Sequence, residues 1–341
     1  MTVPLPSTLE QLGWSAFFAD QLRDGDAGLA SKRISSVHRS RIEAIDMTGP
    51  VRLELPGNSN TADFAVGDWI LADPLTGMFV KRLDRKSLFQ RRPEGGRGLQ
   101  LIAANVDTLL VVTSCNADFD PARLERYLIM ADQAGSEPVI VLTKADTAED
   151  VGRFQSQAEA LQRDLPVIAL NGRSADAVAL LRPWLGKGQT IALVGSSGVG
   201  KSTLVNTLTG SHTKQKTGTI REYDAQGRHT TTARSLHAVS GGGWVIDTPG
   251  IRKLYVSDVT NGIDTLFAEI TELAPLCRFR DCTHAHEPGC AVQGAVARGE
   301  LGADRLERWR GLHAENADRT PVVSGPRGNK VNRKKHHLLR P

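Results

Sequence analysis

A glycine-rich stretch in the middle of the chain has the composition and spacing of a phosphate-binding loop. It fits the pattern G-x-x-x-x-G-K-S in Gly195, Ser196, Ser197, Gly198, Val199, Gly200, Lys201 and Ser202, and Thr203 follows. An apolar run at 191–194 precedes it, and a helical pattern at 202–208 follows it, ended by Gly210; this is the strand–loop–helix context that the motif requires. Its glycines allow successive N–H groups to point at phosphate oxygens. We expect Lys201 to reach the β- and γ-phosphates and Ser202 to ligate Mg²⁺.

An acidic residue after a second apolar run predicts the other magnesium ligand. Asp247 and Gly250 belong to the tetrapeptide Asp-Thr-Pro-Gly that follows residues 244–246. In P-loop proteins such an acid holds Mg²⁺, and a nearby glycine N–H contacts the γ-phosphate. The polar stretch before it contains His229 and the threonines at 230–232. We interpret it as a switch loop in which one of these threonines joins the Mg²⁺ shell, although the sequence does not say which.

Three residues after another apolar run predict recognition of guanine. Thr143, Lys144 and Asp146 match the pattern [N/T]-K-x-D directly after residues 138–142. An aspartate at this position accepts hydrogen bonds from guanine N1–H and the 2-amino group, which adenine does not present. The lysine stem lies along the face of the base. The motif therefore favours GTP over ATP.

The order of these motifs along the chain is unusual. The guanine motif precedes the phosphate loop and the Asp-Thr-Pro-Gly segment, whereas it follows them in most GTPases. A parallel sheet keeps its arrangement when the original termini are joined and the chain is cut in another surface loop. The sequence thus predicts a circularly permuted P-loop GTPase domain. The segment after Gly250 then leads straight into the C-terminal region, so nucleotide state could move that region directly.

Three cysteines and a histidine in the last quarter of the chain predict a metal site. Cys277, Cys282, His284 and Cys290 offer three thiolates and an imidazole within a short segment. This donor set suits a tetrahedral Zn²⁺ site, and four protein ligands make the metal structural. His286 is an alternative to His284. Cys115 is interpreted as a small core residue.

The elements that must position these residues change in character along the chain. Short strand-like runs separated by turns, at 41–45, 51–55, 69–72 and 78–83, predict a small barrel, for which an oligonucleotide-binding (OB) fold is a candidate. After a linker at 91–98, apolar runs alternate with helical patterns such as 121–134, which predicts an α/β domain with a parallel sheet. We expect an N-terminal extension (1–32), an OB-like barrel (33–98), the permuted GTPase domain (99–260) and a helical zinc-binding region with a basic tail (261–341).

The charge distribution suggests a polyanionic partner. The net charge is only +4, but residues 31–41 carry four Lys or Arg and no acid, and residues 326–341 carry six and no acid. Residues 81–97 carry seven Lys or Arg against two acids. Such segments favour docking to nucleic acid, the alternative being ordinary solvated surface. No run of 18 apolar residues and no secretory signal are found. Four cysteines do not make a disulfide framework, so we expect a reducing, cytoplasmic setting. We also expect a monomer.

Together these motifs resemble the small-ribosomal-subunit-dependent GTPase A family. The resemblance covers residues 33–310 and depends on TKAD at 143–146, GSSGVGKST at 195–203, GRHTTT at 227–232, DTPG at 247–250 and the Cys–His cluster at 277–290. It implies an OB-fold domain, GTP hydrolysis stimulated by the small ribosomal subunit, a late role in maturation of that subunit, and contacts to its ribosomal RNA. Two departures are Thr143, where most GTPases have Asn, and residues 169–172 (ALNG), where the family has a Ser-Ala pair near guanine.

Ile251 follows the Asp-Thr-Pro-Gly segment, where many GTPases place the glutamine that orients the attacking water. An aliphatic side chain cannot do this, so another residue or a partner must complete the site. His229, which matches the family's GRHTTT, is our candidate, the alternative being a surface histidine without a catalytic role. Two other functions remain open at this point: an ATP-dependent enzyme, and an RNA-docking protein in which GTP acts only as a switch.

Overall fold

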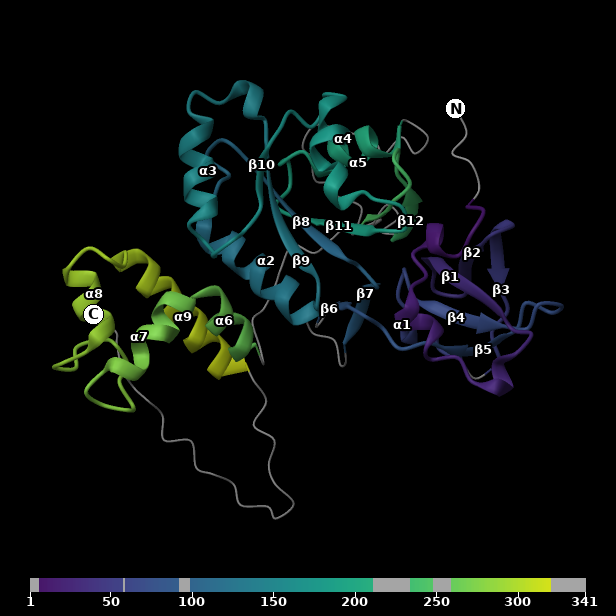
Figure 1. The fold of residues 1–341 in the computed structure, drawn as a ribbon, viewed down its shortest axis with the longest axis horizontal. Coiled ribbons are helices and arrows are strands. Elements are labelled where there is room, and N and C mark those ends of the chain that lie inside the picture. Colours follow the sequence, from purple (N-terminus) through teal and green to yellow (C-terminus); the bar gives the residue numbers. More distant parts are fainter. Residues whose placement is uncertain (1–5, 58, 92–98, 211–233, 248–258, 320–341) are drawn as a thin grey trace, which may run out of the picture.

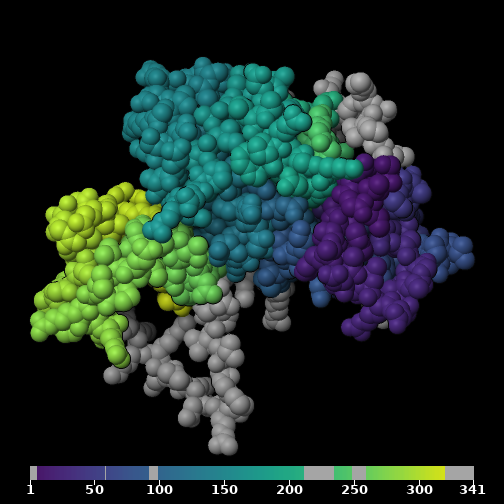
Figure 2. All heavy atoms as spheres, in the orientation of Figure 1, coloured from purple at the N-terminus to yellow at the C-terminus, as the bar shows by residue number. Residues whose placement is uncertain are grey.

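The protein forms a row of three parts along its longest dimension (Figure 1). The computed structural model describes residues 6–57, 59–91, 99–210, 234–247 and 259–319. The N-terminal barrel and the C-terminal helices lie at opposite ends, and the α/β part lies between them (Figure 2). This arrangement matches the predicted class of an α/β domain flanked by an N-terminal barrel and a C-terminal helical region.

The barrel consists of five strands wound around a small apolar core. The strands are β1 (Ala30–Val37), β2 (Ile42–Asp46), β3 (Gly49–Leu53), β4 (Trp69–Ala72) and β5 (Phe79–Arg82). β1 pairs with both β2 and β4, β2 with β3, and β4 with β5, all antiparallel. A parallel bridge between Glu54 and Met78 brings the end of β3 beside the start of β5. This closes the order 1-2-3-5-4-1 and leaves no long free edge, as expected for an OB-type barrel.

A parallel sheet forms the central part. Its strands are β8 (Thr108–Ser114), β9 (Glu137–Thr143), β10 (Val167–Ala169), β11 (Thr190–Val194) and β13 (Trp244–Asp247), with β12 (Ser235–Ala238) antiparallel at one side. The order across the sheet is β10-β9-β8-β11-β13-β12, after which a single pairing of Ser235 with Ser36 joins the barrel strand β1. All these parallel strands therefore end at the same edge of the sheet, where ligands bind in open α/β sheets.

Alternate residues of each strand point to opposite faces of this sheet, so both faces present apolar side chains. Helices cover both faces and bury these side chains. Leu109 and Val111 belong to the core formed with α2 (Pro121–Ala134) and α3 (Val151–Glu159). Leu110 and Val112 belong to the core formed with α4 (Asp176–Leu181) and α5 (Lys201–Thr209). The all-apolar runs of the sequence reflect strands that are buried on both faces.

The C-terminal part is helical. Its helices are α6 (Thr260–Leu266), α7 (Ala268–Leu273), α8 (Ala291–Ala297) and α9 (Ala303–Arg319). Two of them, α6 and α9, contact α2. Gly262 of α6 lies so close to α2 that a Cβ there would be 3.1 Å from Asp132 Oδ2 and 3.3 Å from Ile129 Cγ2. The absence of a side chain at residue 262 therefore permits this close approach of the two helices.

Several elements differ from the sequence prediction. The predicted linker at 91–98 begins within a strand, β6 (Leu88–Arg91), that pairs with β7 (Gln100–Ala104). The N-terminal segment contains the short α1 (Ala16–Ala19) beside a 3-10 turn. β12 was also not predicted, because four residues of which only Leu236 is buried give too weak a pattern. Among the helices described, none combines the length and apolar character required to cross a bilayer.

Several cations of the first two basic segments are buried or paired within the chain. Arg33 is only 1% exposed, and the side chain of Lys32 lies 2.7 Å from Asp46. In the second segment, three cations are paired with acids elsewhere: Lys81 with Asp26 at 2.5 Å, Arg85 with Asp68 at 2.6 Å and Lys86 with Asp107 at 3.1 Å. These residues are therefore not the free cationic surface that the charge runs suggested. The third segment, at 326–341, lies outside the described residues.

Candidate nucleotide site and metal cluster

The phosphate loop joins β11 to α5 at the carboxyl edge of the sheet. Gly195 has a φ of +144°, and a Cβ there would lie 2.1 Å from the carbonyl oxygen of Val112, so no other residue fits at this first loop position. Gly200, with a φ of +97°, is the N-cap of α5. Lys201 Nζ donates to the carbonyl oxygen of Gly195 at 2.8 Å and also to that of Ser196. The lysine thus lies over the loop, where it can reach a bound phosphate.

The guanine motif contacts the phosphate loop directly through Thr143. Its hydroxyl oxygen lies 2.5 Å from the carbonyl oxygen of Val199 and 3.0 Å from that of Thr113, so its hydrogen is shared between them. The side chain is buried, with 2% exposed. Thr143, which stands where most GTPases have Asn, therefore links β8, β9 and the loop through hydrogen bonds of its hydroxyl group.

The two other residues of this motif lie at the surface after β9. Lys144 adopts the left-handed conformation, with a φ of 56°, and its carbonyl oxygen accepts from Thr147 N at 3.1 Å. This turn brings Asp146 to an exposed position, where its carboxylate is accessible to a base. Beyond β10, the carbonyl oxygen of Gly172 accepts from Thr207 of α5 at 2.7 Å, so the ALNG segment lies beside the helix that follows the phosphate loop.

Part of the proposed magnesium site is described. Ser202 is exposed in the first turn of α5, and Asp247 is the last residue of β13. β11 and β13 are adjacent and parallel, with Ala192 opposite Ile246. Asp247 therefore lies beside the end of β11, where the phosphate loop begins, which fits a hydroxyl and a carboxylate holding Mg²⁺ with phosphate. His229, the threonines at 230–232 and Gly250 lie outside the described residues.

The four predicted metal ligands lie together. All their donor atoms fall within 4.8 Å of one another. Cys277 Sγ and Cys290 Sγ are 3.8 Å apart, and each lies 3.5 Å from His284 Nδ1. With Zn–S near 2.3 Å and Zn–N near 2.0–2.1 Å, tetrahedral geometry requires edges of about 3.8 Å and about 3.5 Å. The separations among Cys277, Cys290 and His284 therefore suit three ligands of one four-coordinate metal ion.

The state of the histidine also suits a ligand. His284 is 4% exposed, and burial lowers the pKa of its imidazole below the ordinary value. The ring is therefore neutral at pH 7, as metal binding requires. His286, the alternative ligand considered from the sequence, is not part of the cluster.

Two residues that the sequence did not single out hold the ligand loop in shape. The Glu287 carboxylate accepts hydrogen bonds from Thr283 N at 2.9 Å, Thr283 Oγ1 at 2.5 Å and Ala285 N at 3.0 Å. These bonds bring the pKa of Glu287 far below its usual range. Gln293 Nε2 donates to the carbonyl oxygen of His284 at 2.6 Å. Both residues thus fix His284, which has a φ of 57°. Neither belongs to a ligand pattern, so sequence reasoning had no signal for them.

The fold and the site define a circularly permuted P-loop GTPase, with the guanine motif before the phosphate loop and a Cys₃His cluster after it. A family model described as RsgA GTPase matches residues 82–257. The chain is 62% identical over 332 residues to a Small ribosomal subunit biogenesis GTPase RsgA from Mesorhizobium japonicum, covering 97% of this chain and 96% of that protein. It is 47% identical to an RsgA 2 from Vibrio vulnificus, covering 93% and 90%. The chain belongs to the RsgA GTPase family, as the resemblance implied, and is a GTP hydrolase.

Solved structures agree with this assignment. The crystal structure of YjeQ from Thermotoga maritima matches with a TM-score of 0.62 and 25% identity, covering 85% of this chain and 99% of that one. The structure of YloQ, a circularly permuted GTPase, matches with a TM-score of 0.61, covering 88% and 99%. Its 24% identity supports the fold alone.

Proposed function

We propose that this protein acts in late maturation of the small ribosomal subunit and hydrolyses GTP to GDP and phosphate when that subunit stimulates it. The observation that carries the proposal is the full-length similarity to proteins named for small ribosomal subunit biogenesis, at 62% identity over 97% of the chain. The order of parts along this chain, a barrel, a permuted GTPase domain and then a Cys₃His module, also supports the proposal. We keep the domain divisions at residues 32, 98 and 260 as part of the proposal.

In this mechanism the chain's own groups bind and orient the nucleotide. Backbone N–H groups of residues 195–200 and the Lys201 ammonium hold the phosphates, and the exposed Asp146 carboxylate selects guanine. Gly250 contacts the γ-phosphate through its N–H, and Thr203 completes the first turn of α5. Ser202 and Asp247 would hold Mg²⁺, which neutralises phosphate charge when bound.

Stimulation follows from a catalytic site that this chain leaves incomplete. Ile251 cannot orient water, so we assign that role to His229, acting when the small subunit is bound. Completion of such a site by a partner is worth on the order of 10³–10⁵ in rate. Slow turnover by the protein alone is therefore expected.

We propose that the metal-ligand loop contacts ribosomal RNA. Its side chains support this, because Arg278, Phe279 and Arg280 are all exposed and the Arg278 guanidinium lies 5.5 Å from the Phe279 ring. Exposed arginines beside an aromatic ring suit unpaired bases and phosphates. Zinc is the metal that the cluster dimensions favour. A cytoplasmic, monomeric state completes the proposal.

The test is GTP turnover by the purified protein alone and with isolated small ribosomal subunits, with ATP and the Lys201→Ala variant as controls. We expect strong stimulation that is specific to GTP and absent in Lys201→Ala. His229→Ala should retain GTP binding and lose the stimulated rate. Equal turnover with and without subunits would overturn the partner role, and equal use of ATP would overturn the role of Asp146.

A further inference from the structure

An arginine on helix α2 reaches the phosphate loop from outside the motif. Arg123 Nη1 donates a hydrogen bond to Ser196 Oγ, although the two residues are 73 positions apart in the chain. Ser196 is the second residue of the loop, and its carbonyl oxygen accepts from Lys201 Nζ. One loop residue is thus held by Lys201 through its backbone and by Arg123 through its side chain.

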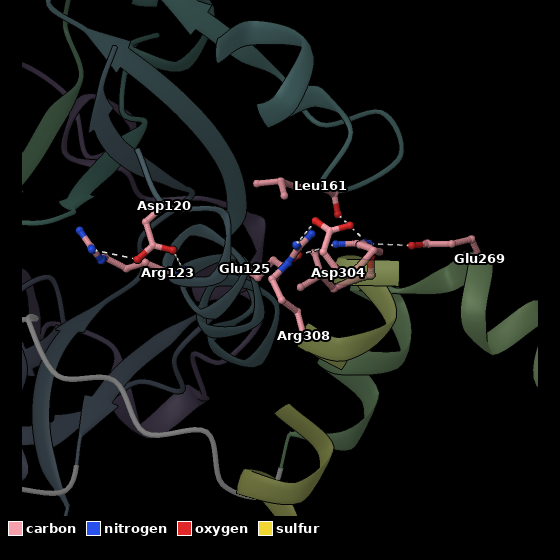
Figure 3. Close-up of polar contacts among 9 residues, drawn as sticks. Asp120, Arg123, Glu125, Leu161, Glu269, Asp304 and Arg308 are labelled. Atoms are coloured by element: carbon pink, nitrogen blue, oxygen red, sulfur yellow. Dashed lines mark hydrogen bonds and ion pairs between the residues drawn. The ribbon is translucent and has the colours of Figure 1, made fainter. Parts of the chain in front are cut away.

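The arginine is itself held in place at the start of its helix. Asp120 is the N-cap of α2, and its Oδ1 accepts from Arg123 N at 3.2 Å. The other carboxylate oxygen, Oδ2, accepts from Arg123 Nη2 at 2.9 Å. The helix is anchored in the core by Leu124 and Leu128, each 2% exposed. Arg123 leaves α2 on the side opposite Glu125, which faces the C-terminal helices (Figure 3).

We propose that Arg123 is a positioning residue for GTP hydrolysis, acting through Ser196 to fix the phosphate loop in its binding shape. It does not act as a free cation next to the nucleotide. Its charge is paired with Asp120, and both side chains are 40% exposed, so solvent screens the charge. Its contribution is the hydrogen bond that orders the loop before phosphate arrives.

The expected kinetic effect follows from where the loop acts. Its N–H groups bind phosphates in the GTP complex, the transition state and the GDP complex alike, so a disordered loop weakens all three. Loss of such uniform binding raises KM and leaves kcat nearly unchanged. One hydrogen bond from a partly exposed donor is worth about as much as an ordinary one, which corresponds to roughly a 5-fold rise in KM for GTP and a similar rise in the Kd for GDP.

The competing explanation is that Arg123 belongs to an ordinary surface ion pair with the residue three positions before it. Such pairs contribute little to stability, and their loss would leave the nucleotide site unchanged. Arg126 provides a matched control, because it is an arginine on the same helix with a comparable exposure of 34% and pairs instead with Glu315 at 2.5 Å.

The experiment measures KM, kcat and GDP affinity for Arg123→Ala, Ser196→Ala, the double variant and Arg126→Ala, with thermal unfolding as a check on folding. We expect Arg123→Ala and Ser196→Ala to raise KM to a similar extent and the double variant to go no further, since each removes the same bond. Arg126→Ala should leave KM within twofold of the parent. Arg123→Lys, which keeps one donor, should recover part of the loss.

The inference is overturned if Arg123→Ala behaves like Arg126→Ala, or if the effects of Arg123→Ala and Ser196→Ala on KM multiply in the double variant. It rests on the phosphate loop proposed above, so Lys201→Ala is measured alongside. If Lys201→Ala also binds GDP normally, the proposed loop itself fails. If only the Arg123 and Ser196 variants bind normally, the loop stands and this inference alone fails.

Discussion

At the scale of single residues, the proposed selection of guanine depends on one exposed carboxylate. Asp146 follows the left-handed Lys144, which turns the chain outward after the buried β9. The motif residues are sequential, so their type predicts their chemistry without knowledge of the fold. What the sequence did not predict is that the neighbouring Thr143 hydroxyl contacts the phosphate loop at Val199.

We predict that Asp146→Asn lowers GTP affinity by about 3 kcal/mol, roughly a factor of 100, because it loses charge-assisted hydrogen bonds to N1–H and the 2-amino group. An Asn amide instead presents a donor and an acceptor, which match the 2-oxo group and N1–H of xanthine. The variant should therefore gain affinity for xanthosine triphosphate, measured by competition against labelled nucleotide. Unchanged GTP binding would show that Asp146 does not face the base. Asp150→Asn, which alters an exposed acid in the same loop, is the control.

The metal cluster gives a second prediction at this scale. Glu287→Ala removes the acceptor for three loop donors beside His284, so the ligand loop must be ordered by the metal itself. We expect zinc affinity to fall about 10-fold, as for other residues that orient a ligand. Competition with a chromogenic chelator measures it. Glu300→Ala, whose exposed carboxylate pairs with Arg298 at 2.7 Å in the same region, should leave affinity unchanged.

These examples show which residues a sequence can identify. The phosphate loop and the metal ligands are contiguous, so their spacing alone predicts that they act together. Arg123 and Ser196 meet only because β8 and β11 are adjacent in the sheet. Nothing in the sequence distinguishes Arg123 from any arginine on a helix surface.

At the scale of elements, α2 joins the nucleotide site to the C-terminal helices. Glu125 is completely buried on this helix, and its carboxylate lies 2.7 Å from Arg305 and 2.9 Å from Arg308 of α9. Arg305 also donates to the carbonyl oxygens of Leu161 and Leu266 and pairs with Glu269 at 2.8 Å (Figure 3). This cluster fixes α9 against the GTPase part, so the two should unfold together.

We predict that Glu125→Ala costs about 3 kcal/mol in the free energy of unfolding, because the buried Arg305 would lose its buried carboxylate partner and keep only the exposed Glu269. Urea unfolding monitored by tryptophan fluorescence measures it, since Trp309 lies on α9. Glu272→Ala breaks the exposed Glu272–Arg163 pair, whose atoms are 3.5 Å apart, and should cost under about 0.5 kcal/mol. Equal costs for the two variants would mean that the buried cluster does not anchor α9.

At this scale, elements were predictable where the sequence marks their ends clearly. The pattern at 121–134 gave α2 with the bounds that the structure has, because Asp120 caps it, Pro121 begins it and Gly135 ends it in the left-handed conformation. β6, β7 and β12 are short and partly exposed, so their residues carry no clear alternation. Their pairing partners, not their own sequences, make them strands.

At the scale of the whole molecule, a charge run does not predict a charged surface. Lys32 and Arg33 looked like part of a polyanion-binding segment, but their partners lie elsewhere in the chain. Arg33 departs most from the expected charged surface, since it is buried where the N-terminal segment, the barrel and the GTPase sheet meet. Burial lowers the pKa of Arg33 to about 10, so it is still a cation at neutral pH.

The contacts of this buried cation connect all three regions. Arg33 Nη1 donates to the carbonyl oxygen of Leu12 at 2.5 Å, and Nη2 donates to Thr190 Oγ1 of β11 at 2.7 Å. The guanidinium also lies 5.9 Å from the Trp69 ring of β4. β11 leads directly into the phosphate loop, so this arginine links the barrel to the strand that carries the nucleotide site.

We predict that Arg33→Ala destabilises the protein by about 3 kcal/mol, because it leaves buried oxygens unpaired and a cavity beside Trp69. Hydrogen exchange should then increase in β1 and at the start of β11 more than in β9, and urea unfolding should lose cooperativity as the barrel separates from the GTPase part. Arg52→Ala, which alters a 69% exposed side chain on the same barrel, should change stability by under about 0.5 kcal/mol. Arg33→Met fills the space without donating. If the Arg33→Met variant is as stable as the parent, packing and not hydrogen bonding joins the barrel to the GTPase sheet. A change in the position of the barrel would then break no hydrogen bond to β11, the strand that leads into the phosphate loop.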